Sequence, residues 1–272
     1  MNQKNFIIEV DKCTGCNLCV VACKDEHVDS SYIPWSKPQP EGGHFWMNVK
    51  AVERGTIPRV RMSFLPLMCQ HCEEAPCVTA CPEGAIKTRD DGLVWIDGEK
   101  CTGCGDCQPA CPYDVIYKND DLKIAQKCTG CAHRLDEGEL PRCVDVCPHE
   151  AILFKQADAT DSSLEFLHPE HEVKPRVLWR GLPKPWITGA IINGKADEVV
   201  IGASVKATNL MDGTILKTIS NEFGEFWLTG LLLNNHYRVD ILADGYCDFS
   251  TKVLLTKEKD IGLIELMTTA KA

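Results

Sequence analysis

The segment CTGCGDCQPACP at residues 101–112 decides the fold of the chain around it. Its four cysteines have the spacing C-x2-C-x2-C-x3-C, and Pro112 follows directly. Three thiols at every third position wrap a tight loop around one face of a metal centre, while the fourth, expected to open a helix, points elsewhere. The spacing therefore predicts three ligands to one centre and a fourth ligand to its neighbour.

Related arrangements occur four times in the chain. Sixteen of the 17 cysteines form quartets, and Cys247 stands alone, where we expect a buried core thiol. The quartets are Cys13, Cys16, Cys19 and Cys23; Cys69, Cys72, Cys77 and Cys81; Cys101, Cys104, Cys107 and Cys111; and Cys128, Cys131, Cys143 and Cys147. This internal repeat predicts several metal centres in one domain.

Three kinds of site compete for cysteines at this density. Disulfides need an oxidising compartment and partners from separate segments, and zinc sites usually place two ligands on each of two turns. The run C-x2-C-x2-C-x3-C-P fits neither and is the bacterial ferredoxin signature, so it favours [4Fe–4S] clusters. The loop glycines Gly15, Gly103 and Gly130 are expected to let the backbone approach the cluster sulfides.

Hairpin patterns follow the second and third quartets. They are predicted from residues 85–87 to 93–96 and from residues 115–117 to 122–125, each around an Asp-rich turn. The order of strand, turn, strand, cluster loop and helix is then that of a two-cluster ferredoxin. Quartets two and three therefore form one module, at residues 66–127, and the simplest arrangement of quartets one and four is a second, split module.

The quartets depart from the free ferredoxin pattern in their spacing. Four residues separate Cys72 from Cys77, and eleven separate Cys131 from Cys143. The four runs are CTGCNLCVVACKDEH, CQHCEEAPCVTACPEGAI, CTGCGDCQPACPYDVI and CTGCAHRLDEGELPRCVDVCPHEAI. In this order they resemble the four-cluster iron–sulfur subunit of the dimethyl-sulfoxide-reductase family of molybdopterin oxidoreductases. The resemblance covers about residues 1–180, including KPRVLW at Lys174–Trp179.

The resemblance implies that ligands cross between quartets, so that four [4Fe–4S] clusters are held by four mixed sets. These sets are Cys13, Cys16, Cys19 and Cys147; Cys128, Cys131, Cys143 and Cys23; Cys69, Cys72, Cys77 and Cys111; and Cys101, Cys104, Cys107 and Cys81. The resemblance also implies a large catalytic subunit on another chain, which carries the molybdopterin, and it is compatible with a higher oligomer of heterodimers.

Two further segments separate the cysteine-rich parts from each other and from the C-terminal part. Residues 24–68 are rich in proline and aromatic residues, so they are either a loop packed over the clusters or a docking surface for a partner. Residues 155–185 are predicted to be an extended connector. His44, His71 and His133 are expected at the surface or in packing around the centres, because every quartet is already complete, and Trp95 is expected in the core.

The C-terminal part changes to short strands with alternating polarity. Seven are predicted, at 186–192, 204–208, 215–218, 225–228, 237–243, 248–254 and 261–266. The string from Gly202 to Tyr246 resembles the transthyretin-like or Cna-B-like domain, with no convergent catalytic set. The overall expectation is an α+β protein: two interlocked ferredoxin-like modules at 1–154, the connector, and an all-β seven-stranded sandwich at 186–272 with a structural or docking role.

Charge and hydropathy exclude two classes of partner. The chain has 29 Lys and Arg against 39 Asp and Glu, a net charge of -10, which argues against binding to nucleic acid. No apolar run is long enough for a transmembrane segment, and the N-terminus lacks the apolar stretch of a signal peptide. Because cluster assembly requires reduced thiols, the cytoplasm is the expected location.

The sequence predicts no catalytic residue on this chain, since every expected metal ligand is used and no acid–base pair accompanies the cysteines. The leading hypothesis is an electron-transfer subunit that passes single electrons to or from the molybdopterin subunit. The alternatives are a free polyferredoxin, a respiratory subunit that passes electrons to a membrane anchor, and a zinc-stapled binding module.

Overall fold

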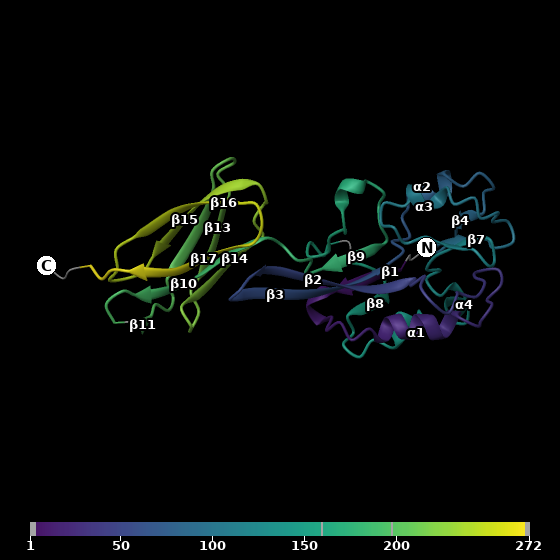
Figure 1. The fold of residues 1–272 in the computed structure, drawn as a ribbon, viewed down its shortest axis with the longest axis horizontal. Helices are drawn as coiled ribbons and strands as arrows, with labels where there is room; N and C mark the ends of the chain where they lie inside the picture. The colour runs from purple at the N-terminus through teal and green to yellow at the C-terminus, as the bar shows by residue number, and fades with distance from the viewer. Residues whose placement is uncertain (1–3, 159, 197, 270–272) are drawn as a thin grey trace. The chain divides into compact units, whose positions relative to one another are not determined.

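The computed structural model describes residues 4–158, 160–196 and 198–269 (Figure 1). The chain divides into two compact units. The first contains the residues up to Val52 and those from Ser63 to Leu182, and the second contains Glu53–Met62 and the residues from Pro183 onward. The ends of the predicted domains, at residues 1–3 and 270–272, lie outside the described residues, as does residue 159 of the predicted connector.

A three-stranded sheet forms the core of the first unit. Its central strand β1 (Asn5–Glu9) pairs antiparallel with β8 (Ile152–Lys155) and parallel with β9 (Val177–Arg180). The prediction of an extended connector is therefore wrong for β9, where Trp179 is completely buried. The alternating apolar side chains of β9 bury one face of the strand, which keeps this segment in the first unit.

Short helices and hairpins carry the cysteine loops of the first unit. The helices are α1 (Leu18–His27), α2 (Pro76–Thr79), α3 (Cys107–Ala110), α4 (Ala132–Asp136) and α5 (Arg142–Asp145). The hairpins join β4 (Ile86–Thr88) to β5 (Val94–Ile96) and β6 (Tyr117–Asn119) to β7 (Ile124–Gln126). Both predicted hairpins are present, although the second starts two residues later than expected. Trp95 is buried, as predicted, and packs edge-on against Trp35.

A long hairpin occupies the second half of the segment at 24–68. Strands β2 (Met47–Thr56) and β3 (Arg59–Met68) have ten residues each and form a two-stranded sheet with one another. The sequence suggested a loop or a docking surface here and did not reveal either strand. The tip of the hairpin, Glu53–Met62, belongs to the second unit.

The second unit is built mainly from two four-stranded sheets. In one sheet β10 (Trp186–Asn193) pairs with β11 (Glu198–Val199), β14 (Glu225–Thr229) and β17 (Lys259–Leu266). The other has the order β13 (Ile215–Ile219), β12 (Ser204–Asn209), β15 (Asn235–Leu242) and β16 (Phe249–Leu255). All seven predicted strands occur within one or two residues of their expected ends, and in the described residues of this unit the two-residue strand β11 is an eighth.

The inner faces of these sheets form a separate apolar core. Val205 lies opposite Ile241 and Ala207 opposite Val239 across β12 and β15, and all four side chains are fully buried. Cys247, expected in this core, is instead exposed in the turn between β15 and β16, where its side chain has no inner face to occupy. No helix in the described parts of the chain is long and apolar enough to cross a membrane.

Candidate metal centres

The first group of thiols joins the beginning and the end of the cysteine-rich region. Cys13, Cys16, Cys19 and Cys147 line one pocket of about 330 Å³, its open mouth included. Burial, followed by repulsion from Cys13, Cys147 and Cys16, raises the pKa of Cys19 to about 12. The antiparallel pairing of β1 with β8 places these two distant segments side by side. The structure therefore brings together the first expected ligand set.

The second group joins helix α1, which carries Cys23, the loop before α4 and helix α5, which carries Cys143. Burial, followed by repulsion from Cys128 and Cys131, holds the pKa of Cys23 well above its usual value. Burial and the thiols of Cys131, Cys128 and Cys23 do the same to the pKa of Cys143. All four side chains are buried. The second expected set, Cys23, Cys128, Cys131 and Cys143, is thus also assembled.

The third group combines quartet two with the last cysteine of quartet three. Burial, followed by repulsion from Cys69, Cys111 and Cys77, raises the pKa of Cys72 to about 12. Cys81, the fourth cysteine of quartet two, instead lines a pocket with Cys101, Cys104 and Cys107. The grouping therefore crosses between the two quartets, as the resemblance implied.

The fourth group completes the exchange. Cys81, Cys101, Cys104 and Cys107 line a pocket of about 310 Å³, its open mouth included. Burial, followed by repulsion from Cys101, raises the pKa of Cys107 to about 11, with smaller contributions from Cys77 and Cys104. All sixteen expected ligands consequently fall into the four mixed sets. We call these sets one to four, in the order in which they have been described.

The helices differ in one respect from the sequence expectation. The fourth cysteine of each quartet was expected to open a helix, but Cys111 directly follows α3, whereas Cys107 begins it. Cys81 and Cys147 likewise follow α2 and α5. These three helices have four residues each, so the chain carries the fourth thiol away from the loop within about one turn. Cys23, by contrast, lies within the ten-residue helix α1.

Backbone amides point at several of the thiols. The N–H groups of Ala85, Ala125, Gly130 and Ala151 donate to Cys81, Cys101, Cys128 and Cys147 at 3.2–3.3 Å. Those of His71 and Arg142 donate to Cys69 and Cys131 at 3.4 Å. Such donors stabilise thiolates and raise the reduction potential of an iron–sulfur cluster.

The loop glycines are required by backbone geometry. Gly103 has φ +68°, and a Cβ there would lie 2.3 Å from the carbonyl oxygen of Lys123. Gly15 and Gly130 have similar φ values, and a Cβ on them would overlap Phe64 and Leu93. The three glycines thus allow the cysteine loops to pack closely against neighbouring segments, a role that the sequence alone did not reveal.

The histidines lie around the sets rather than within them. His71 is fully buried, and its Nδ1 accepts the N–H of Val94 at 3.1 Å. His133 stacks on Tyr32, and His44 stacks on Tyr117. No role for His27 was predicted from the sequence, yet its Nε2 lies 3.8 Å from the Sγ of Cys131. Burial, with the nearby His133, lowers the pKa of His27 to about 3, so the ring is neutral.

The four sets lie in a linear order. Cys19 of set one is near Cys23 and Cys143 of set two, where it adds to the repulsion that raises the pKa of both thiols. Cys69 of set three acts in the same way on Cys128 of set two. Cys77 of set three acts on Cys107 of set four. The order is therefore one, two, three, four.

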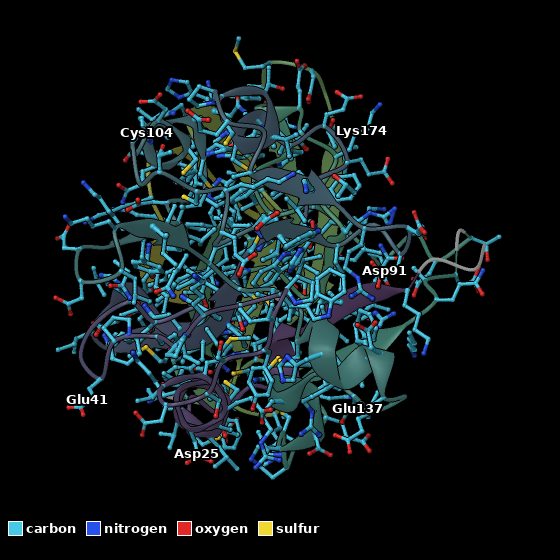
Figure 2. The ribbon with its side chains drawn as sticks, turned by 90° about the vertical axis from the view of Figure 1, so that its right-hand side faces the viewer. Asp25, Glu41, Asp91, Cys104, Glu137 and Lys174 are labelled. Atoms are coloured by element: carbon cyan, nitrogen blue, oxygen red, sulfur yellow. The ribbon has the colours of Figure 1, made fainter. Side chains whose placement is uncertain are left out.

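The most exposed thiols lie at the two ends of this row. Cys16 in set one and Cys104 in set four are the exposed members of the sixteen, and the side chains of set two are all buried. Cys104 lies at the periphery of the molecule in the view of Figure 2. A row of centres with a buried middle and exposed ends can pass electrons through the protein from one surface to another.

The donor chemistry fits [4Fe–4S] clusters. Each set offers four soft sulfur ligands, and all sixteen cysteines are free thiols rather than disulfides. The thiols raise one another's pKa, so the grouping becomes favourable when iron replaces the protons. When bound, such clusters take up and release single electrons.

Three family models match the chain. Two are described as 4Fe-4S dicluster domains and match residues 12–85 and 60–157. The third is described as a carboxypeptidase regulatory-like domain and matches residues 186–264. Two dicluster matches over the sixteen cysteines identify the cofactors as four [4Fe–4S] clusters.

Similar proteins match about two thirds of the chain or nearly all of it. The small subunit of pyrogallol hydroxytransferase from Pelobacter acidigallici is 38% identical over 98% of this chain and 100% of its own length. A tetrathionate reductase subunit from Salmonella typhimurium is 34% identical over 67% of this chain and 74% of its own. A sulfite dehydrogenase subunit from Allochromatium vinosum is 36% identical, over 64% and 81%.

Proposed function

Because the chain belongs to the family of iron–sulfur electron-transfer subunits of molybdopterin oxidoreductases, we propose that it relays single electrons to or from a molybdopterin-containing catalytic subunit on another chain. The linear order of the four thiol sets, with exposed members only at its ends, is the observation that carries this proposal. The chemistry of the substrate then takes place on the partner. Because assembly of the clusters requires reduced thiols, we expect the chain to mature in the cytoplasm.

The proposed ligation follows the thiol sets. Set one (Cys13, Cys16, Cys19, Cys147) and set two (Cys23, Cys128, Cys131, Cys143) each hold one cluster, as do set three (Cys69, Cys72, Cys77, Cys111) and set four (Cys81, Cys101, Cys104, Cys107). Crossing ties the modules together, because no cluster is complete within a single quartet. The close grouping of each set supports this assignment.

The specific activity that we propose is hydroxyl transfer between polyhydroxybenzenes, as in a pyrogallol–phloroglucinol transhydroxylase. The match to the pyrogallol hydroxytransferase small subunit extends over nearly the whole chain, whereas the matches to the tetrathionate and sulfite enzymes cover about two thirds of it. The overall transfer needs no net electron flow. The clusters would then set the oxidation state of the partner's metal and would not have to accept electrons in each turnover.

The test is an activity assay of the complex, purified anaerobically through a tag on this chain. We expect conversion of pyrogallol to phloroglucinol without any added electron acceptor. The complex could instead leave pyrogallol unchanged and reduce tetrathionate, or oxidise sulfite, with an artificial electron carrier. That result would contradict hydroxyl transfer as the specific activity but would still support electron transfer to or from a catalytic partner. A tagged chain that carries four clusters but purifies without a large subunit would contradict the relay to a partner and favour a free polyferredoxin.

A further inference from the structure

A lysine lies inside the first unit, between two of the thiol sets. Lys127 follows β7, is 2% exposed and is among the largest fully buried side chains of the protein. Burial of an ammonium group is costly unless hydrogen bonds and opposite charge compensate for the lost hydration. The groups that contact Lys127 therefore show what compensates for the burial of its charge.

Three acceptors surround the ammonium group of Lys127. Its Nζ lies 3.3 Å from the Sγ of Cys69 and 3.1 Å from the carbonyl oxygen of Cys128, and it also donates to the carbonyl oxygen of Val94. Three acceptors use all three N–H groups of a protonated lysine. In the part of the chain that the structure describes, no carboxylate forms an ion pair with Lys127. The Sγ of Cys69, which is a thiolate once it binds iron, is the side-chain acceptor among the three.

Lys127 lies next to members of both set two and set three. Cys69 belongs to set three, and the next residue after Lys127 is Cys128, a member of set two. The charge on Lys127 opposes the effect of burial on the pKa of Cys77 and of Cys128. The ammonium group thus acts on thiols of both middle sets, with its direct contact on set three.

From these contacts we infer that Lys127 is a positioning residue that raises the reduction potential of the cluster on set three, at the middle of the relay. This inference rests on the proposed ligation. A [4Fe–4S] cluster with four thiolates carries about two negative charges when oxidised and gains one more on reduction. A buried cation next to a ligand sulfur stabilises the reduced form more than the oxidised form, because water does not screen it there.

The test is a redox titration of the anaerobically purified complex, followed by EPR, for the wild type, Lys127→Gln and Lys118→Gln. Lys118 is a matched control because its side chain is half-exposed and pairs with the exposed Asp120, at 3.8 Å. For Lys127→Gln we expect the reduction equilibrium of the set-three cluster to fall tenfold or more, which is a shift of about 59 mV to lower potential for each factor of ten. The set-two cluster should shift less, and sets one and four should stay unchanged.

The outcomes separate this inference from the proposed function. Lys127→Gln could keep its full iron content while the reduction equilibrium constant of every cluster stays within about twofold of the wild-type value. In that case the inference about Lys127 is wrong, and the proposed electron relay is unaffected. If the wild type itself lacks four clusters, the ligation is wrong. If Lys127→Gln loses iron, pulsed EPR of reduced wild type labelled with ¹⁵N at lysine Nζ decides: a ¹⁵N coupling to one cluster supports the inference, and its absence overturns it.

Discussion

The Nη1 atom of Arg59 lies 2.8 Å from the Oδ2 atom of Asp260, although 201 residues separate them in the chain. Nη2 of the same arginine lies 3.3 Å from Glu225, and the neighbouring Arg61 stacks its guanidinium 3.7 Å from the ring centroid of Trp227. The tip of the hairpin β2–β3 is therefore held by charge and ring contacts on the two-sheet unit. Because these side chains are largely buried, the contacts are screened less than ordinary surface ion pairs.

We predict that Arg59→Ala releases the hairpin tip. Loss of two charged hydrogen bonds should destabilise the packing of residues 53–62 by about 2 kcal/mol. Hydrogen exchange measured by mass spectrometry should then be faster in this segment, while exchange in the cysteine-rich segments stays unchanged. Arg238→Ala is the control, because Arg238 is half-exposed on a strand of the same unit and pairs with Asp240. Equal exchange in the wild type and Arg59→Ala would contradict this role of Arg59.

Two glycines with positive φ, Gly103 and Gly84, differ in the space around them and can be compared by substitution with alanine. Gly103→Ala should lose the set-four cluster, since an alanine there costs about 1–2 kcal/mol for positive φ and also overlaps the backbone of Lys123. Gly84→Ala has a similar positive φ but open space around the new Cβ, so it carries only the conformational cost. Iron analysis should find about four fewer iron atoms in Gly103→Ala and a full content in Gly84→Ala. A full iron content in both variants would show that the close approach of Gly103 to the backbone of Lys123 is not required for binding the set-four cluster.

The exchange of ligands between quartets can be tested by comparing which cluster signal each cysteine variant changes. Cys111→Ser and Cys72→Ser should change the same EPR signal, because both residues belong to set three. Cys107→Ser should change a different one, although Cys107 is a quartet neighbour of Cys111. If Cys111→Ser and Cys107→Ser instead affect one signal together, the clusters follow the quartets and the crossed assignment is wrong.

Removal of iron should act on the two units differently. The core of the first unit includes the side chains of Cys19, Cys69 and Cys128, so anaerobic chelation leaves mutually repelling thiols where the clusters were. The second unit has its own core, which contains none of the sixteen ligand cysteines. After chelation, amide protection should be lost in the first unit and kept in strands β12, β15 and β16. Simultaneous loss of protection in both units would contradict this independence.

The sequence predicted the local features well. The cysteine spacings, the hairpins beside them and the strands of the C-terminal sandwich were recognisable because each depends on residues close together in the chain. The crossed grouping required the family resemblance, since spacing alone leaves the fourth cysteine of each quartet without a defined partner.

Features that depend on distant contacts were missed. Val177 and Trp179 form a buried strand only because β1 lies beside them, and their proline-rich surroundings suggested a connector. The ten-residue strands β2 and β3 were hidden by irregular polarity. Lys127 gave no signal at all, because a lysine next to a cysteine is ordinary in sequence and unusual only once its burial is known.

The most direct test of the relay is a measurement of iron, acid-labile sulfide and molybdenum in the complex purified anaerobically through a tag on this chain. We expect about 16 iron and about 16 sulfide per chain, with about one molybdenum and a large second subunit. Zinc in place of iron, without sulfide, would contradict the cluster assignment entirely. Iron and sulfide in full amount, with neither molybdenum nor a second subunit, would contradict the central claim of a relay to a molybdopterin partner.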